Sequence, residues 1–426
     1  MPTFQKEREA ERMLPVEEAQ ARVLDAVRVL GTEVVPLGEA IGRVLREDVR
    51  AIRDVPLRDN SAMDGYAVLA SDVEGPSKES PARLRVVEDV PAGRLATRRV
   101  EPGTAVRIMT GALLPEGADV VVPVELTNAG SELLEVHRPV RAGANIRRRG
   151  EDMREGEIVL TAGTRILAGD LGVLASVQKT RVEVGLRPDV AILSTGDEVI
   201  EADAPFEPGK VVNSNSWTLA ALAAETGAQP RRLGIVADTL EETKEAIRGT
   251  TGAEFVLSTG GVSVGAFDFV KDALDELGAE TKFWQVAMKP GKPLVLSELD
   301  GRLYFGLPGN PVSCMVSFIL FVGPAIRKAA GESGGVLPPI VRMRTAGALR
   351  SRGDRRQYVR VRVIARGGEL VAEPVAAQGS GQTTSMVGVN GFAIVETGTK
   401  LIEAGAMVDV VLFGIPFAPD ETVSSS

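Results

Sequence analysis

The spacing of hydrophobic and polar residues changes several times along the chain, and each kind of spacing predicts a different kind of structure. Residues 15–30 carry apolar side chains at helical spacing and stop before Gly31, which predicts an amphipathic helix. Between about residues 51 and 144, short valine-rich runs are separated by proline and glycine, which predicts a mostly β region. Residues 145–184 mix both patterns. The clearest strands predicted in the β region are 83–90, 105–109, 119–125 and 133–137.

From residue 188 onward, apolar runs alternate with amphipathic helices. This alternation is typical of a three-layer α/β domain with a mainly parallel sheet. Ligands of such sheets bind at the carboxyl ends of the strands, so the loops at 194–198, 258–265 and 306–311 should meet at one cleft. The predicted strands are 190–194, 232–236, 254–258, 281–286, 294–297 and 303–306, and the predicted helices are 215–226, 240–248, 268–277 and 311–329.

The last part of the chain returns to short alternating runs. A glycine-rich segment at 331–335 has the composition of a linker. The runs that follow it, such as 340–344, 357–364 and 407–413, predict a small C-terminal β domain.

Composition excludes several classes of protein. The chain has 426 residues, a formal net charge of −9 and a pI near 5.1, which argues against nucleic-acid binding. With one cysteine, Cys314, and one histidine, His137, neither a disulfide framework nor an ordinary zinc site is expected. The apolar stretch 312–326 is too short to span a bilayer and predicts a buried helix. The first residues have no apolar signal core, and we expect a soluble cytoplasmic protein.

Two segments rich in proline and glycine predict a ligand site. They are Lys289-Pro-Gly-Lys-Pro293 and Gly306-Leu-Pro-Gly-Asn-Pro-Val-Ser313. Glycine lets the backbone approach a ligand and proline holds it rigid, while Lys289 and Lys292 offer two positive charges to an oxyanion or phosphate. Either segment alone could be a turn. Together with the glycine loop at 258–265, they indicate a binding site.

Familiar catalytic motifs do not explain these segments. Gly261-Val-Ser-Val-Gly265 matches the nucleophile elbow of α/β-hydrolases, but that fold needs a histidine after the serine, and His137 precedes it. The glycines are better explained as room for a ligand, with the hydroxyls of Ser258, Thr259 and Ser263 as donors. Gly291-Lys292 lacks the spacing of a Walker A loop, and no Gly-x-Gly-x-x-Gly fingerprint opens the α/β region.

Acidic residues follow several of the strands that should end at the cleft. They are Asp197, Glu198, Asp238 and Asp268. Carboxylates around a phosphate pocket suit Mg²⁺, which binds few carboxylates together with phosphate oxygens. Asp268, at the expected start of a helix, could instead be only a helix cap.

Seven segments, taken in order, resemble the molybdopterin molybdenumtransferase family, which includes MoeA and the E domain of gephyrin. The resemblance extends over about residues 12–415. The segments are Asp59-Asn-Ser-Ala-Met-Asp-Gly-Tyr-Ala67, Arg107-Ile-Met-Thr-Gly-Ala112, Asn145-Ile-Arg-Arg-Arg-Gly-Glu-Asp152, Ser194-Thr-Gly-Asp-Glu198, Ser258-Thr-Gly-Gly-Val-Ser-Val-Gly265, Lys289-Pro-Gly-Lys-Pro293 and Gly306-Leu-Pro-Gly-Asn-Pro-Val-Ser313.

The resemblance implies an enzyme that inserts molybdenum from molybdate into adenylylated molybdopterin, with Mg²⁺, and releases AMP. It implies a homodimer, and transient contacts with the molybdopterin adenylyltransferase and with molybdoenzymes. Neither a nucleic acid nor a membrane is an expected partner. The resulting domains are an elongated mixed domain at 12–52 and 145–186, an inserted β-rich domain at 53–144, the α/β molybdopterin-binding domain at 187–331 and a C-terminal β domain at 336–416.

Motifs and resemblance together predict the site residues. The segment at 355–360 departs from the usual family pattern. The predicted catalytic residues are Asp59, Thr110, Asp152, Glu198, Asp238 and Asp268, with Glu198, Asp238 and Asp268 as Mg²⁺ ligands. The predicted substrate-binding residues are Ser258, Gly260, Gly261, Ser263, Gly265, Lys289, Lys292, Pro308, Gly309, Asn310, Pro311, Ser313, Arg355, Arg360 and Ser380.

Three alternative functions stay open at this point. A related α/β domain adenylylates molybdopterin, but that reaction alone would not need residues 1–186 or the C-terminal domain. A scaffold role of the gephyrin type is a second alternative, although no further enzymatic module or long linker accompanies the domains. The third is a homologue that takes tungstate, and nothing in the sequence separates the two oxyanions.

Overall fold

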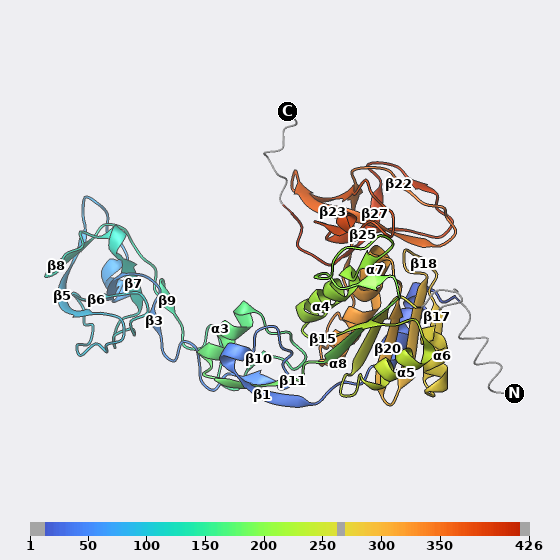
Figure 1. The fold of residues 1–426 in the computed structure, drawn as a ribbon. Helices are drawn as coiled ribbons and strands as arrows, with labels where there is room; N and C mark the ends of the chain where they lie inside the picture. Colours follow the sequence, from blue (N-terminus) through green and yellow to red (C-terminus); the bar gives the residue numbers. More distant parts are fainter. Residues whose placement is uncertain (1–12, 262–268, 418–426) are drawn as a thin grey trace. The chain divides into compact units, whose positions relative to one another are not determined.

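The computed structural model of the protein describes residues 13–261 and 269–417 and divides the chain into two compact units (Figure 1). The first unit contains the chain up to residue 47, residues 162–167 and everything from 181 onward. The second contains residues 48–161 and 168–180. The chain therefore leaves the first unit and returns to it twice.

A six-stranded sheet forms the centre of the first unit. Four neighbouring strands run parallel, because helical connections join them, and the next strand runs antiparallel as part of a hairpin. That hairpin turns at Asp300-Gly301, where both residues have positive φ, as a type I′ hairpin turn requires. The strands, in spatial order, are β15 (Gln229–Val236), β12 (Asp189–Thr195), β16 (Phe255–Thr259), β20 (Arg302–Leu307), β19 (Pro293–Leu299) and β17 (Glu280–Gln285).

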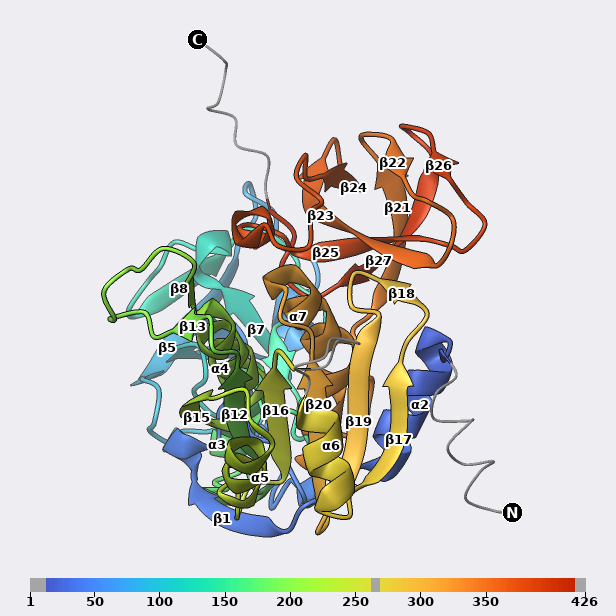
Figure 2. The same cartoon turned by 45° about the vertical axis from the view of Figure 1, so that its right-hand side comes forward.

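Helices cover both faces of this sheet, as Figure 2 shows. One apolar core joins the sheet to α2 (Val16–Ala26), α4 (Ser214–Thr226) and the helix that begins at Pro311. A second core joins the opposite face to α5 (Leu240–Arg248) and α6 (Phe269–Glu276). The prediction of a three-layer α/β domain is confirmed.

The helix that follows β20 is continuous but changes its winding. It consists of α7 (Pro311–Ser317), a π-helical turn η4 (Phe318–Val322) and α8 (Gly323–Ala329). Among the described residues, this is the one helix long and apolar enough to cross a membrane, yet 83% of its most apolar window is buried inside the protein. It is therefore a core helix, as the sequence predicted.

The N-terminal helix is shorter than its apolar pattern predicted. α2 ends at Ala26, and Val27 already has extended backbone angles. Val27 and Val29 are β-branched and favour extended backbone, so the apolar spacing continues where the helix does not. The chain then forms β1 (Thr32–Pro36), which pairs with β11 (Arg181–Gly185).

The C-terminal part of the first unit is a closed β barrel, because β25, at the end of the strand order that starts from β23, also pairs with β23. The lysine segment takes part in it: β18 (Met288–Lys289) runs parallel to the start of β23, with Lys289 opposite Gln357. The predicted small β domain is confirmed. Its strands, in order around the barrel, are β23 (Arg356–Arg366), β24 (Glu369–Pro374), β21 (Ile340–Thr345), β27 (Met407–Leu412) and β25 (Gly391–Val395).

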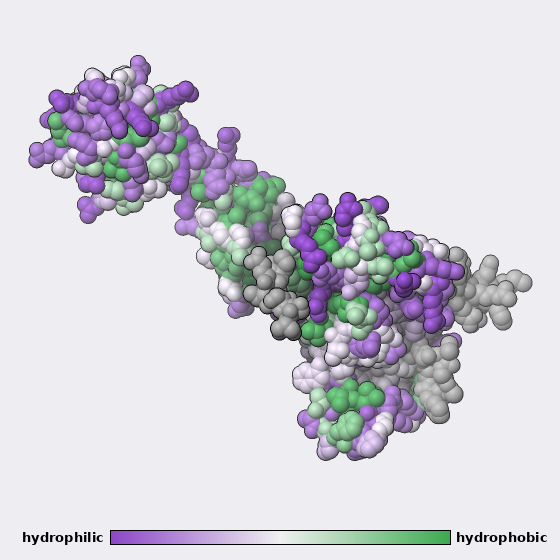
Figure 3. Space-filling view, turned by 90° about the horizontal axis from the view of Figure 1, so that it is seen from above, coloured by the Kyte–Doolittle hydropathy of each residue, from purple (hydrophilic) through white to green (hydrophobic). Residues whose placement is uncertain are grey.

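The second unit is mostly β, in agreement with its valine-rich pattern. Its five-stranded sheet has apolar cores on both faces, and its outer surface is mostly hydrophilic where Figure 3 shows it, at the upper left. The sheet order is β7 (Val120–Pro123), β4 (Gly65–Val68), β6 (Thr104–Ile108), β5 (Ala82–Val90) and β8 (Leu133–Val136). The other elements are β2 (Val49–Arg50) paired with β10 (Ile158–Leu160), β3 (Asn60–Ser61) paired with β9 (Ile146–Arg147), and α3 (Ala168–Ser176).

Candidate functional site

A cleft of about 550 Å³ opens at the carboxyl ends of β12, β16 and β20. Because these strands are parallel, the loops that follow them reach the same edge of the sheet, and the predicted meeting of three loops is confirmed for the described residues. Two further walls come from the N-terminus of α4 and from the barrel domain. The cleft is lined by Ser194, Thr195, Glu198, Val199, Val211, Val212, Asn213, Ser214, Asn215, Thr259, Gly260, Gly309, Asn310, Pro311, Gly381 and Thr383.

Glycine is needed where the three loops approach each other. Gly260 has φ of +93°, and a Cβ placed on it would lie 2.7 Å from the carbonyl oxygen of Thr195. A Cβ on Gly309 would lie 3.7 Å from the Cα of Gly260. The floor of the cleft is therefore built from backbone, which leaves room for a ligand.

The N-terminus of α4 is fixed by two asparagines that the sequence analysis missed. Asn213 caps the helix, since its side chain accepts a hydrogen bond from the N–H of Ser216. Asn215 donates from Nδ2 to Thr259 Oγ1 at 2.6 Å and to the carbonyl of Gly309 at 2.8 Å. The signal was present, because an asparagine just before a helix is a frequent N-cap.

One buried hydroxyl at the cleft lacks a partner. Thr195 is 7% exposed, and its Oγ1 has no hydrogen bond within the described parts of the chain. Ser258, predicted as a donor, is fully buried one residue before the cleft, and its Oγ also lacks a partner there. Buried polar groups are seldom left unpaired, so the Thr195 hydroxyl, which lines the cleft, is a candidate for contact with a ligand.

The acidic residues predicted near the cleft are partly brought together. Asp197 and Asp238 each accept a hydrogen bond from the other's backbone N–H, at 3.1 and 3.2 Å respectively. Burial, together with the charges of Asp197 and Glu198, raises the pKa of the Asp238 carboxyl, although the N–H of Asp197 acts in the opposite direction. Glu198 is exposed and lines the cleft. The described residues contain no group of three or more acidic, histidine or cysteine side chains placed to hold a metal, and Asp268 lies outside them.

The lysine segment packs against the start of the long helix. Gly291 has φ of +100°, and a Cβ on it would lie 2.5 Å from Met288 Cε and 3.0 Å from Ser317 Oγ. The N–H of Val286 donates to the carbonyl of Lys292 at 2.9 Å, which closes the loop. Lys289 is half-buried and Lys292 is exposed, while Ser317 Oγ has no partner among the described residues.

Arg360 is a buried cation in β23, the barrel strand with which the lysine segment pairs. It is 1% exposed, and its Nη2 donates to the carbonyls of Ala377 and Gly379 at 2.8 and 3.2 Å. No carboxylate pairs with it and its Nε has no partner, as far as the structure describes the chain. Burial lowers the pKa of its guanidinium. The carbonyl of Ser380, which follows Gly379, accepts from the N–H of Val312 at 3.1 Å.

The remaining predicted binding residues differ in their surroundings. Ser313 is buried in the first turn of α7, and Pro308 is buried before it, whereas Asn310 and Pro311 line the cleft. Arg355 pairs with its neighbour Asp354 at 3.1 Å, which competes with any anion for this guanidinium. Gly261, with φ of +63°, is the last described residue of its loop, and the predicted residues Ser263, Gly265 and Asp268 lie outside the described residues.

Asp59, Thr110 and Asp152 belong to the second unit. Asp59 accepts from the N–H of Arg149 at 2.8 Å and from Arg148 Nη1 at 2.6 Å, and these donors, the N–H first, lower the pKa of its carboxyl. Thr110 donates its N–H and its hydroxyl to the same oxygen of Asp64, both at 2.7 Å. Asp152 is exposed. Asp64 is thus the direct hydrogen-bond partner of Thr110. It lies in the motif at 59–67 but was not predicted as a site residue.

Comparison with known proteins gives a consistent result along the chain. Residues 14–178 match the MoeA N-terminal region (domain I and II), residues 191–328 match a probable molybdopterin binding domain, and residues 342–413 match the MoeA C-terminal region (domain IV). A molybdopterin molybdenumtransferase of Bacillus subtilis is 38% identical over 409 residues, which cover 94% of each chain. Molybdopterin molybdenumtransferase 2 of Mycobacterium tuberculosis is 38% identical over 349 residues, covering 80% of this chain and 86% of the relative.

Solved structures agree with this result. The crystal structure of the molybdopterin biosynthesis moeA protein from Pyrococcus horikoshii superimposes with a TM-score of 0.80 at 30% identity, covering 94% of this chain and 100% of the other. The fold of a molybdenum cofactor biosynthesis protein from Pyrococcus furiosus is also similar, with a TM-score of 0.59 at 22% identity. The resemblance inferred from the motifs is confirmed, and the chain belongs to the molybdopterin molybdenumtransferase family, whose members are transferases of molybdenum cofactor biosynthesis.

Proposed function

We propose that this protein inserts molybdenum from molybdate into adenylylated molybdopterin and releases AMP. Both substrates are anions, so the protein must offset their mutual repulsion with fixed positive charge and backbone donors. The single observation that carries the proposal is Arg360, a buried guanidinium with an unused N–H and no carboxylate partner among the described residues. A buried cation without a counter-charge is costly, and a bound oxyanion would supply that charge.

The surroundings of Arg360 support an oxyanion over a larger anion. Ser380 follows Gly379, whose carbonyl Arg360 binds, and it is tied to the start of α7. Strand pairing holds Lys289 opposite Gln357, at the start of the strand that carries Arg360. Gln357, opposite Lys289, has a buried Oε1 without a partner in the described chain. Molybdate is small and doubly charged, and in this proposal Arg360, Lys289 and Lys292 supply the positive charge that offsets it.

The cleft at the carboxyl edge of the sheet is proposed to hold the adenylylated pterin. The start of α7 links the two regions, because Gly309, Asn310 and Pro311 line the cleft while Val312 is bonded to Ser380. The floor of the cleft is backbone at Gly260 and Gly309, which allows phosphate groups to approach closely. Molybdate bound near Ser380 would therefore lie close to a pterin in the cleft.

Glu198 and Asp238 fit a role in holding Mg²⁺ at this cleft. The raised pKa of Asp238 reflects its burial and the nearby negative charges, which a cation would offset. Two carboxylates suffice, since Mg²⁺ takes its other oxygens from water and phosphate. When bound, Mg²⁺ would neutralise charge on the diphosphate. The protein's own residues bind and orient the two anions, and none of the described residues at the cleft has the setting of a protein nucleophile.

An AMP-release assay tests this proposal. Purified protein is incubated with adenylylated molybdopterin, Mg²⁺ and molybdate, and AMP is measured over time. We expect AMP release to require molybdate and Mg²⁺ together. Formation of adenylylated molybdopterin from ATP and molybdopterin, without molybdate-dependent AMP release, would contradict the proposal and favour adenylylation. Replacing molybdate by tungstate in the same assay measures which oxyanion is preferred.

The proposal includes a cytoplasmic homodimer that meets the adenylyltransferase and molybdoenzymes transiently. It rests on the family to which the chain belongs. Molar mass from light scattering tests the dimer. A mass of about 45 kDa, that of a single chain, would contradict it.

A further inference from the structure

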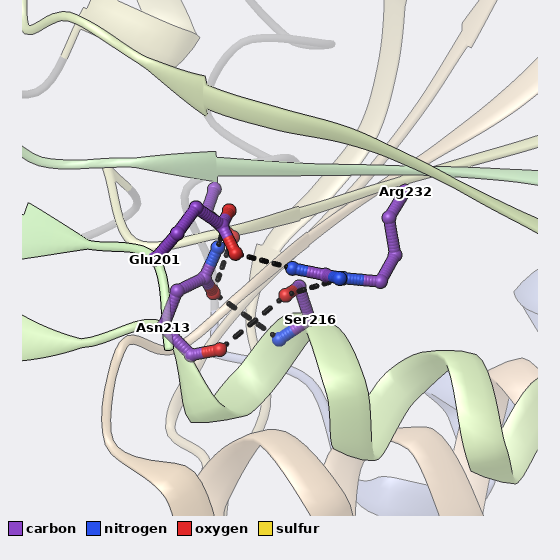
Figure 4. Close-up of polar contacts among 5 residues, drawn as sticks. Glu201, Asn213, Ser216 and Arg232 are labelled. Carbon is purple, nitrogen blue, oxygen red and sulfur yellow. Dashed lines mark hydrogen bonds and ion pairs between the residues drawn. The ribbon is translucent and has the colours of Figure 1, made fainter. Parts of the chain in front are cut away.

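A connected set of polar side chains begins in the lining of the cleft and extends away from it to Glu201 and Arg232, and Figure 4 shows it. Asn213 is at its centre. The Oδ1 of Asn213 accepts from the Ser194 hydroxyl at 2.9 Å and from the N–H of Ser216 at 3.3 Å, while its Nδ2 donates to Glu201 Oε1 at 3.0 Å. The other Glu201 oxygen accepts from Arg232 Nη2 at 2.5 Å. Every polar atom of the Asn213 amide thus has a defined partner.

Arg232 is itself held on three sides. Its Nε donates to Ser216 Oγ at 3.0 Å, and its guanidinium carbon lies 3.9 Å from the centre of the Trp217 ring. It projects from β15, the edge strand of the central sheet. A guanidinium fixed by a hydroxyl and an aromatic ring offers a rigid anchor for the Glu201 carboxylate.

The set connects the three backbone segments that form one wall of the cleft. Ser194 is at the end of β12, Glu201 follows the segment that carries Glu198, and Asn213 begins α4. Between the last two, β13 (Val199–Ile200) pairs in parallel with β14 (Val211–Val212). The backbone N–H of Asn213 donates to the carbonyl of Ile200 at 2.8 Å, so the side-chain contacts reinforce this pairing.

Glu201 decides which way the Asn213 amide faces. An amide has one accepting and one donating end, and only its partners fix the orientation. A reversed amide would turn its NH₂ group toward the Ser216 N–H, which is also a donor, and the cap of α4 would be lost. The Glu201 carboxylate attracts the NH₂ group and so holds the oxygen toward the helix and toward Ser194.

We propose that Glu201 and Arg232 are positioning residues for the ligand that occupies the cleft. They act through Asn213, which holds the start of α4 and the Glu198 segment in the arrangement that binds the phosphate-bearing ligand. The ligand identity rests on the proposed function, whereas the positioning does not. Neither Glu201 nor Arg232 needs to touch the ligand.

A matched ion pair on the same strand provides the control. Arg231, next to Arg232, donates from Nε to both oxygens of Asp189 at 2.8 and 3.0 Å. That pair joins β15 to the beginning of β12, at the amino ends of these strands, whereas the cleft lies at the carboxyl ends. Glu201→Ala and Asp189→Ala therefore each remove one partly exposed arginine–carboxylate pair from β15, but only the first reaches the cleft wall.

Hydrogen exchange of backbone amides tests the positioning without a ligand. We expect Glu201→Ala to speed exchange of amides in residues 196–201 and 211–216 by about tenfold or more, and Asp189→Ala to leave these segments unchanged. Unchanged exchange in Glu201→Ala, or equal acceleration by Asp189→Ala, would overturn the proposal. If Glu201→Ala does not fold, Glu201→Gln replaces it, because it keeps the side-chain length and weakens only the charged contacts.

Affinity for adenylylated molybdopterin, measured by calorimetry, tests the consequence for binding. Asn213→Asp places two carboxylates against each other and should weaken binding by about tenfold. Adding Glu201→Gln exchanges the donor and the acceptor, because the new amide at position 201 donates to the new carboxylate at position 213. The total charge of the pair is then the same as in the wild-type protein. The double variant should restore binding to within about threefold of wild type. A double variant no better than Asn213→Asp would overturn the role in binding. If the wild-type protein binds no adenylylated molybdopterin, the proposed function fails, and the exchange result still decides the positioning.

Discussion

The Asn215 amide donates to Thr259 Oγ1 at 2.6 Å, so the first turn of α4 is tied directly to the end of β16. The same amide donates to the carbonyl of Gly309, which precedes α7. Three segments from distant parts of the sequence therefore depend on one side chain that also lines the cleft. This arrangement suggests that the shape of the cleft can be altered by small changes to its polar contacts, while the apolar cores keep the fold intact.

Replacing Asn215 by alanine tests this dependence. The variant loses two hydrogen bonds and leaves the Gly309 carbonyl without this partner, which should lower the free energy of unfolding by about 1–2 kcal/mol. Affinity for adenylylated molybdopterin should fall by about tenfold, as measured by calorimetry. Asn128→Ala is a suitable control, because the Asn128 side chain also makes several hydrogen bonds to backbone, but in a loop of the second unit. Equal affinities in the two variants would contradict a role for Asn215 at the cleft.

Gly260 offers a test of the close approach between loops. In Gly260→Ala, both the positive φ and contact with the Thr195 carbonyl should destabilise the protein, by about 1–3 kcal/mol for the backbone angle alone. Gly252→Ala separates the two causes, since Gly252 has a similar φ of +87° with no atom near the added methyl group. We expect a larger drop in melting temperature and a loss of ligand affinity only in Gly260→Ala. Matching melting temperatures would show that the loops do not constrain each other.

Much of the first unit could be predicted from local pattern. The helix at 240–248 has the predicted bounds, because Thr239 caps it and its apolar residues follow helical spacing. The central strands were recognisable as valine- and leucine-rich runs, since both faces of that sheet are covered. Local pattern failed at 27–30, where β-branched residues keep the apolar spacing of a helix in an extended segment.

The parts that could not be predicted depend on contacts between distant residues. The pairing of Lys289 with Gln357 brings the lysine segment to the barrel domain, and nothing local to either residue indicates it. The link from Arg232 through Glu201 to Asn213 likewise joins residues that look like ordinary surface polar groups in the sequence. For the same reason Asp64, the partner of Thr110, went unnoticed, whereas the glycine and proline motifs were visible because they restrict the backbone locally.

The lysine segment leads to a prediction about molybdate. Lys289→Ala combined with Lys292→Ala should raise the molybdate concentration for half-maximal AMP release by at least about tenfold, equivalent to about 1.4 kcal/mol, because the proposed oxyanion site loses two positive charges. The KM for adenylylated molybdopterin should change much less. Lys244→Ala controls for a general loss of positive charge, since Lys244 pairs with Glu241 and Glu276 on helices away from the cleft. An unchanged molybdate dependence in the double variant would count against the assignment.

Asp238 gives a prediction about pH and Mg²⁺. Because its pKa is raised in the folded protein, above the usual 3.8, the folded state favours the protonated carboxyl. The contribution of the Asp238 carboxyl to stability is therefore complete when the pH is below the pKa of this group in the unfolded chain. It is lost as the pH rises through the higher pKa of the folded protein. Asp238→Asn keeps an acceptor for the N–H of Asp197 and cannot ionise. The melting temperature of Asp238→Asn, relative to wild type, should therefore rise as the pH increases from about 3.5 to 7.

Mg²⁺ should reverse this difference if Asp238 helps to hold the ion. A bound cation favours the ionised carboxylate, so at pH 7 added Mg²⁺ should raise the melting temperature of the wild-type protein more than that of Asp238→Asn. NaCl at the same ionic strength is the control, since it screens charge without supplying a divalent cation. Equal stabilisation of both proteins by Mg²⁺ would show that Asp238 is not a ligand. A pH-independent difference between the two proteins would show that its carboxyl does not titrate with a raised pKa.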